Sequence, residues 1–125
     1  MDPTNSKLES FHQSVFLIIN RQIIPLTKQV THLGRQLDND IVLQEDYVSR
    51  FHAEIHLEDG KFVIYDKNST SGTYVNSQRI DHCVLNSGDM ISVANSTMMF
   101  VNNNSRLTNR SKITTKNLEK DENIS

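Results

Sequence analysis

Apolar positions between residues 15 and 101 fall into short runs, and none of them repeats with the 3.6-residue period of a helix. Val15–Ile19 is a run of β-branched and aromatic side chains, whereas Ala53–Leu57 alternates apolar and polar positions, as expected for a strand with one buried face. Further strand-like segments span residues 21–26, 30–33, 41–43, 62–66, 73–75, 83–85, 90–93 and 98–101. Many short strands in close succession are typical of a β-sandwich or barrel, so the pattern predicts an all-β domain.

Turn-forming residues separate these segments. Asp59-Gly60 stands between two strand-like runs and predicts a hairpin, in which Gly60 can adopt a positive φ. Asn76-Ser77 predicts a second tight turn, and Ser87–Asp89 and Asn95-Ser96 mark two more. The spacing of these turns agrees with strands of three to six residues.

Residues 1–13 and 102–125 differ from this core in composition. The first segment is polar with an early proline, and the second is rich in Asn, Ser, Thr and Lys. Such segments bury too little apolar surface to offset the entropy of ordering. We therefore expect a flexible N-terminal arm over 1–13, a folded domain over 14–101 and a disordered tail over 102–125. The arms also carry threonines that, if phosphorylated, would compete with partners for an anion site on the domain: Thr4, Thr108, Thr114 and Thr115.

Composition narrows the classes of function. The chain has 125 residues, so we expect one domain and no added kinase or other catalytic region within this length. A net charge of −2 gives no general positive field for duplex DNA or anionic membranes, so any phosphate recognition must be local. No apolar run approaches the ~20 residues of a membrane helix, and no signal pattern precedes the first strand. The single cysteine, Cys83, fits a reducing compartment, and we expect a cytoplasmic protein in which Cys83 is a small buried hydrophobe.

Three polar segments stand at the edges of strand-like runs. They are Gly34-Arg35, Ser49–His52 and Ser69–Thr73. Together they supply two arginines and several hydroxyls, which suit an anion with a double charge and many acceptor oxygens, such as a phosphate ester. If the three segments converge in space, they form a phosphate-binding surface.

The order and spacing of these segments, with the residues between them, resembles the forkhead-associated (FHA) domain family. The matching elements are Gly34-Arg35, Asn39–Leu43, Val48–Ile55, Asp66, Ser69, Gly72–Asn76, Leu85, Gly88-Asp89 and Ile91. Each element alone is common, whereas the whole series in this order is specific. The resemblance covers residues 14–101 and implies an eleven-stranded FHA/SMAD-like β-sandwich of two antiparallel sheets. It also implies loops at one end that bind phosphothreonine peptides.

The resemblance assigns roles to individual residues. It implies that Arg35 and Ser49 contact the phosphate, that Arg50 and Thr70 contribute side chains, and that Ser71 stands where the family binds the peptide backbone. It implies supporting roles, in shaping the loops, for Gly34, His52, Gly72, Thr73 and Asn76. We expect no cofactor, no metal and no catalytic residue.

Two residues depart from the family pattern. Ser71 replaces the asparagine that usually precedes Gly-Thr, and its shorter side chain lacks an amide donor. We therefore expect either weaker anchoring of the peptide beside the phosphoresidue or a shifted partner preference, and no loss of phosphate binding. Ser77 replaces the glycine that commonly follows Asn76. If that position has a positive φ, Ser77 costs about 1 kcal/mol of stability.

Other interpretations of the same residues remain. Ser49 and His52 could be a nucleophile and its base, but an orienting acid and an oxyanion hole are not evident. His52 and His56 have a zinc-like spacing only on a helix, because on a strand four residues span about 13 Å. The aromatic residues lack the basic groove of a single-stranded nucleic-acid site. Arg50 could bind phosphate or pair with Glu45 or Asp46.

The sequence therefore predicts a non-enzymatic, phosphothreonine-dependent adaptor in Ser/Thr kinase signalling. Its expected partner is a phosphothreonine-containing protein or peptide, such as a Ser/Thr kinase or its substrate, and the domain is expected to be a monomer that binds neither nucleic acid nor membrane. The alternative is a structural or assembly protein that uses the FHA sandwich as a docking scaffold without phosphate. Loss of a partner after phosphatase treatment would separate the two.

Overall fold

The computed structural model describes residues 14–104, which contain eleven strands. In chain order the strands are β1 (Val15–Ile19), β2 (Gln22–Pro25), β3 (Val30–Gly34), β4 (Ile41–Val42), β5 (Ala53–Glu58), β6 (Lys61–Asp66), β7 (Thr73–Val75), β8 (Gln78–Ile80), β9 (His82–Val84), β10 (Met90–Val93) and β11 (Ser96–Asn102). The predicted arm over 1–13, the tail from 105 onward and the arm threonines lie outside the described residues. The predicted domain end at residue 101 falls one residue short of the end of β11.

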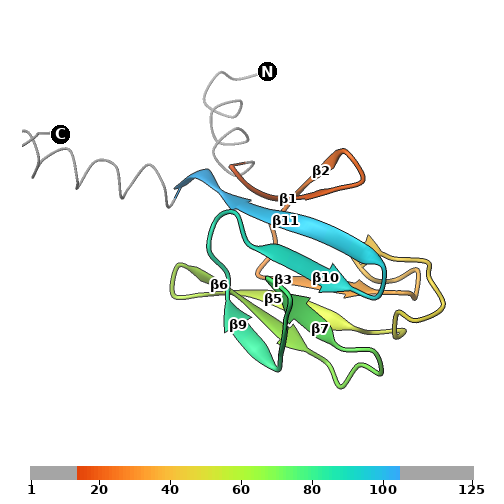
Figure 1. Cartoon of the computed structure of the whole chain (residues 1–125). Coiled ribbons are helices and arrows are strands. Elements are labelled where there is room, and N and C mark those ends of the chain that lie inside the picture. Colours follow the sequence, from red (N-terminus) through yellow and green to blue (C-terminus); the bar gives the residue numbers. More distant parts are fainter. Residues whose placement is uncertain (1–13, 105–125) are drawn as a thin grey trace, which may run out of the picture.

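The strands form two sheets. Sheet A has the order β2-β1-β11-β10-β7-β8, and sheet B has the order β4-β3-β5-β6-β9. Figure 1 shows the part of sheet A around β1, β10 and β11 lying over the part of sheet B around β3, β5 and β6. The predicted antiparallel pairing holds at every paired strand edge in this part of the chain except one, since β4 pairs with β3 in parallel through Leu33 and Ile41.

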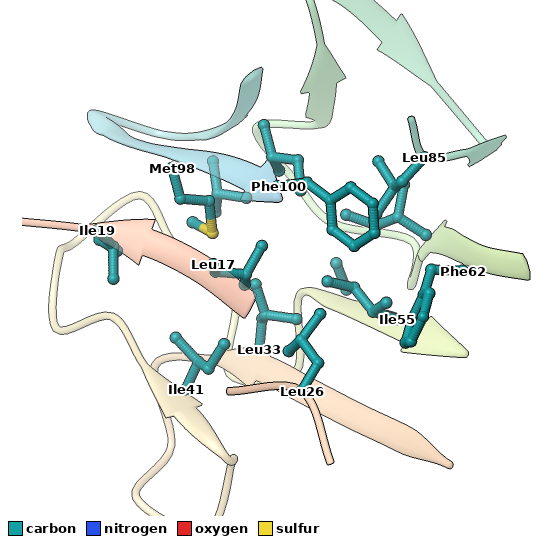
Figure 2. Close-up of a cluster of buried hydrophobic side chains, with 14 of the residues drawn as sticks. Leu17, Ile19, Leu26, Leu33, Ile41, Ile55, Phe62, Leu85, Met98 and Phe100 are labelled. Atoms are coloured by element: carbon teal, nitrogen blue, oxygen red, sulfur yellow. The ribbon is translucent and has the colours of Figure 1, made fainter. Parts of the chain in front are cut away.

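Alternating side chains place the core between the two sheets. In β1, Leu17 points inward and is fully buried, and in β11 Phe100 does the same. Phe100 lies against Phe62 of β6, with ring centroids 5.6 Å apart, so this pair joins the two sheets (Figure 2). Leu33 and Ile55 complete the contact from sheet B. Each such side chain contributes about 1.5–3 kcal/mol when removed from water, and this core fixes the ends of the strands from which the loops emerge.

Two tight hairpin turns have the backbone that the sequence predicts. Glu58 pairs with Lys61 across Asp59 (φ 50°) and Gly60 (φ 79°). In the second turn Asn76 and Ser77 have φ values of 50° and 71°, so Ser77 occupies a left-handed position that glycine adopts more easily. The expected cost of about 1 kcal/mol at Ser77 therefore applies.

The hydrophobic pattern does not predict one of the strands. β8 (Gln78–Ile80) has two exposed residues and one half-buried residue, and it forms the outer edge of sheet A beside β7. Its partners are set by the preceding turn, because Val75 pairs directly with Gln78.

Residues 14–104 include no helix whose length and apolar character would let it cross a membrane.

Candidate functional site

The three polar segments converge at one end of the sandwich. The backbone N–H of Arg35 donates to the carbonyl of Ser49 at 3.0 Å, which joins the end of β3 to the β4–β5 loop. The backbone N–H of Thr70 donates to Ser49 Oγ at 3.1 Å, which joins that loop to the β6–β7 loop. Ser49 therefore contacts both of the other segments, and the three segments form one surface.

Gly34 allows the first of these approaches. A Cβ atom at this position would lie 2.2 Å from the carbonyl oxygen of Arg50, a distance that forces the backbone apart. That carbonyl also accepts from the amide of Asn39 at 2.8 Å and from the backbone N–H of Gln36 at 3.2 Å. The turn after β3 and the β4–β5 loop are thus tied together around a glycine.

Arg35 is held by its inner nitrogen and leaves its outer ones available. Its Nε donates to the carbonyl of Val48 at 2.9 Å. Within residues 14–104 its two terminal amino groups make no hydrogen bond to protein. A guanidinium fixed in this way presents a planar pair of donors to an anion with little loss of side-chain freedom.

His52 is fully buried beneath this surface. Its Nδ1 accepts from the backbone N–H of Ser49 at 3.1 Å, and its Nε2 lies 2.8 Å from the carbonyl oxygen of Gly72. Only the neutral tautomer with hydrogen on Nε2 satisfies both contacts, since a carbonyl can only accept. His52 therefore bridges the β4–β5 and β6–β7 loops.

Asp66, at the end of β6, organises the second loop. Its carboxylate accepts from the hydroxyl and the backbone N–H of Ser69 and from Thr73 Oγ1 at 2.7 Å. Burial by itself raises the pKa of this carboxyl, but these donors outweigh it and hold the pKa below its usual value. Ser69 Oγ also accepts from the N–H of Gly72 at 3.0 Å. Asp66 therefore orients the β6–β7 loop.

Thr70 and Ser71 lie on the same loop and differ in their contacts. Thr70 is exposed, and its hydroxyl has no hydrogen bond to protein within residues 14–104. The Ser71 hydroxyl donates to the carbonyl of Tyr47 at 2.7 Å. A serine hydroxyl has a single hydrogen to donate. That of Ser71 is used in the contact between the β6–β7 and β4–β5 loops, so it is not available to a peptide.

Asn76 lies at the β7–β8 turn. Its side-chain amide donates to Asp89 at 3.0 Å, and its oxygen accepts from the N–H of Met90 at 2.9 Å. These bonds fix the turn to the start of β10, so Asn76 shapes the scaffold.

A hollow of about 450 Å³ opens beside Arg35, Ser49 and Thr70. Arg50 and Lys67 also line it, so three cations surround one space. Arg50 makes no ion pair within residues 14–104. The structure therefore does not show the alternative in which Arg50 pairs with Glu45 or Asp46.

Glu45, the first of those acids, has other partners. Its carboxylate accepts from the backbone N–H of Asn95 at 3.1 Å and from the hydroxyl of Ser96. Asp46 lines a second, smaller hollow of about 180 Å³, together with Tyr47 and Ser71. That hollow shares Arg35, Ser49 and Thr70 with the larger one.

Three residues at the larger hollow are not among the individual site residues that the sequence predicts. Phe51, with 51% of its surface exposed, lies at the wall, and Lys67 and Asn68 line the space from the start of the β6–β7 loop. The position of Lys67 and Asn68 directly before Ser69 is the signal that could have identified them. An aromatic side chain such as Phe51 is more often expected in packing contacts, and its exposure is visible only in the folded loop.

The geometry argues against the nucleophile interpretation of Ser49 and His52. The imidazole accepts from the backbone N–H of Ser49, and Ser49 Oγ accepts from Thr70, so His52 is not positioned as the base for this hydroxyl.

Cys83 is partly buried in β9, and burial first, then the charge of Asp89, raises the pKa of its thiol. A thiol of raised pKa stays protonated near neutral pH and is a poor nucleophile.

Comparisons with known proteins agree with the resemblance to the FHA domain family. The family model of the FHA domain matches residues 31–94. The chain is 41% identical over 76 residues to the glycogen accumulation regulator GarA of Mycolicibacterium smegmatis, an alignment that covers 61% of this chain and 48% of that protein. The chain spans about half the length of the first curated relatives it matches.

Solved structures agree with this match. Mycobacterium tuberculosis EmbR in complex with a low affinity phosphopeptide superposes with a TM-score of 0.69 at 34% identity, over 78% of this chain and 28% of that one. A structure described as an analysis of phosphothreonine-dependent FHA domain interactions gives 0.67 at 30% identity, over 70% of this chain and 95% of that one. The predicted fold and family are confirmed. The chain belongs to the FHA domain family, whose members are phosphothreonine-dependent binding modules.

Proposed function

We propose that this chain binds phosphothreonine peptides through Arg35, Ser49, Arg50 and Thr70 and acts as a non-enzymatic adaptor. The observation that carries the proposal is the convergence of three segments on Ser49, which leaves the Arg35 amino groups and the Thr70 hydroxyl facing one hollow. A phosphate at this place meets a planar fork, hydroxyl donors and a second arginine.

The chemistry of phosphothreonine fits these donors. The group carries about −1.5 to −2 charges at pH 7 and three acceptor oxygens. Each hydrogen bond to a charged group contributes about 1.5–3 kcal/mol. Three or four of them, less the entropy of ordering a peptide, correspond to a micromolar Kd, which suits a reversible signal.

The other predicted residues support the site from behind. Gly34 permits the close approach of the two loops, and His52, Gly72 and Thr73 form the hydrogen-bonded layer beneath it. Ser71 bridges the loops and leaves fewer donors for the peptide backbone. We expect weaker anchoring of the residues beside the phosphothreonine as the consequence.

The biological setting is part of the proposal. The adaptor acts as a monomer in the cytoplasm, and its partner is a Ser/Thr kinase that carries phosphothreonine or a substrate of such a kinase. The chain itself performs no chemistry in this scheme, because the partner supplies any enzymatic activity.

A second candidate is a phosphate-independent scaffold, and one feature of sheet A favours it. Ile23, Ile18 and Met99 stand side by side in register across β2, β1 and β11, with exposed fractions of 62%, 36% and 36%. Exposed apolar rows of this kind are suited to protein contact.

Phosphatase treatment separates the two candidates. A phosphothreonine peptide is titrated against the domain by fluorescence anisotropy, alongside the same peptide with unmodified threonine and the phosphopeptide after phosphatase treatment. The adaptor function predicts micromolar binding of the first and no measurable binding of the other two. Equal affinity for all three would reject it in favour of the scaffold.

A further inference from the structure

The two hollows at the binding end differ in charge. Both share the phosphate-facing residues Arg35, Ser49 and Thr70. The larger hollow adds Arg50 and Lys67 and has no carboxylate in its lining. The smaller one adds Asp46 and no further cation. A peptide whose phosphate sits at the shared residues therefore meets positive charge on one side and negative charge on the other.

The charge count of the larger hollow exceeds that of one phosphate. Arg35, Arg50 and Lys67 bring three positive charges to its lining. A phosphothreonine brings about −1.5 to −2, so roughly one positive charge stays uncompensated in the bound state. Because the whole chain has a net charge of −2, this excess is local to the hollow. A second anionic group on the peptide would neutralise it.

Lys67 is available for such a group. Its side chain is 48% exposed, and the nearest carboxylate oxygen, Glu54 Oε1, is 4.0 Å from its Nζ. The same Glu54 oxygen lies 2.8 Å from His56 Nε2, a closer contact. An exposed pair at 4.0 Å contributes little, so a ligand can take the ammonium without a large loss.

The backbone around Lys67 is fixed, although the ammonium is not. The N–H of Lys67 donates to the carbonyl of His52 at 2.9 Å, and Asn68 adopts a left-handed φ of 59°. These constraints hold Lys67 at the wall of the hollow beside Arg50. Lys67 therefore forms a second anion position beside Arg50 and next to the phosphate position.

We propose that this site selects phosphothreonine peptides carrying a second anionic group on one side, bound by Lys67, with Arg50 lying between that group and the phosphate, and disfavours an anionic group on the opposite side, near Asp46. The proposal rests on the phosphothreonine-binding function given above and specifies its ligand class. The second group is a carboxylate or a second phosphate, since both satisfy the same cations.

A walk of charge along a peptide tests this. The reference peptide has phosphothreonine in an alanine background. In the series, a single aspartate occupies each position from three residues before to three residues after the phosphothreonine, and a parallel series carries phosphoserine. Affinities are measured by calorimetry for the wild type, Lys67→Ala, Lys67→Glu and the control Lys28→Ala, whose residue pairs with Asp40 beside β3 and β4.

The expected result is a ratio of affinities for the acidic and reference peptides of about five to ten at positions on one side, and below one on the other side. The phosphoserine series should give a larger ratio at the same positions, because its charge is greater. Lys67→Ala should bring the ratio toward one, Lys67→Glu should bring it below one at the same positions, and Lys28→Ala should retain the wild-type ratios.

Two failures are distinguishable. If the reference phosphopeptide binds with a micromolar Kd but aspartate and phosphoserine change its affinity at no position, the second anion position is refuted and the phosphothreonine function stands. If neither the reference nor any acidic phosphopeptide binds, both proposals are refuted. A wild-type ratio that persists in Lys67→Ala and Lys67→Glu also refutes the role of Lys67.

Discussion

Two polar regions of this protein use their charges in opposite ways. The outer face of sheet B carries a network in which cations and anions meet one another, whereas the binding end collects three cations, of which only Lys67 has a carboxylate, Glu54 at 4.0 Å, within ion-pair distance in residues 14–104. Both regions contain charged and histidine side chains in close contact. We infer that charged groups with partners inside the protein stabilise the scaffold, whereas donors without such partners that line one hollow indicate a ligand site.

The network on sheet B is closed. Asp40 accepts from Lys28 Nζ at 2.5 Å and from the backbone N–H of His32 at 2.8 Å. The hydrogen bond from Lys28 first, and then that from His32, lower the pKa of Asp40 from 3.8 to about 2. Glu54, paired with His32 in register, lies 2.8 Å from His56 Nε2. This face leaves little charge for a further partner.

The binding end is closed only in its inner half. His52, Asp66 and Thr73 have their polar atoms matched within the protein, and they are buried or partly buried. Arg50 and the outer nitrogens of Arg35 face the hollow. The same loops thus combine a rigid hydrogen-bonded base with a donor surface, which is the arrangement that reduces the entropy cost of binding an anion.

The largest expected effect distinguishes the two regions by binding. Arg35→Ala should weaken phosphothreonine-peptide binding by at least about 100-fold, since it removes two charge-assisted hydrogen bonds of about 1.5–3 kcal/mol each. Lys28→Ala removes a cation from the closed network and should change the affinity by less than about twofold. Calorimetry on both variants decides the matter. Comparable losses in the two variants would mean that binding depends on general charge.

The second comparison concerns stability. His52→Ala should lower the free energy of unfolding by about 2–4 kcal/mol, because it empties a fully buried position and leaves the Gly72 carbonyl and the Ser49 N–H without their partner. His82→Ala, at an exposed position where the ring stacks on Tyr65, should cost less than about 1 kcal/mol. Urea denaturation measures both, and equal costs would contradict the bridging role of His52.

A smaller effect is expected at Ser49. Ser49→Ala removes the acceptor of the Thr70 N–H and one hydroxyl donor to the phosphate, and should weaken peptide binding about tenfold. Ser87 is a matched control, because its hydroxyl also accepts a backbone N–H, that of Asn102 at 2.9 Å, outside the site. Anisotropy titrations of Ser87→Ala should reproduce the wild-type Kd. An unchanged Kd for Ser49→Ala would remove Ser49 from the phosphate contacts.

The smallest expected effect lies on sheet B. The folded-state pKa of Asp40 is depressed, so its contribution to stability is present above about pH 4 and is lost as the pH falls toward 2. Because Asp40 is near the surface, solvent screening limits that contribution to about 1 kcal/mol or less. At pH 7, Asp40→Asn should have a slightly lower free energy of unfolding than the wild type. At pH 2 this difference should shrink, and denaturant unfolding at both pH values measures it. A deficit that is the same at both values would show that Asp40 acts through packing.

The sequence predicts most of the fold because the core strands alternate or concentrate apolar residues. β5 shows this directly, since Ala53 and Ile55 are buried and Glu54 and His56 are not. β8 escapes the pattern because an edge strand of three largely exposed residues has no buried face to mark it. Its position follows from the Asn76-Ser77 turn and from pairing with β7, which are properties of the folded chain.

The candidate site is predictable in part for a similar reason. Arg35, Ser49 and Thr70 stand out as polar residues at strand ends, and the structure brings them together. The contact of Ser71 with the Tyr47 carbonyl and the position of Lys67 at the hollow depend on how two loops meet. The spacing of residues along the chain does not determine how the β4–β5 and β6–β7 loops pack together, so these contacts could not be predicted from the sequence.

Mapping of peptide binding by amide chemical shifts tests the contrast between the two regions most directly. The ¹⁵N-labelled domain is titrated with a phosphothreonine peptide and, separately, with its unphosphorylated form. The account predicts phosphate-dependent shifts at Arg35, Ser49, Arg50 and residues 67–72, with little change at Lys28, His32 and residues 54–58. Shifts centred on the outer face of sheet B, or the same shifts with both peptides, would contradict it.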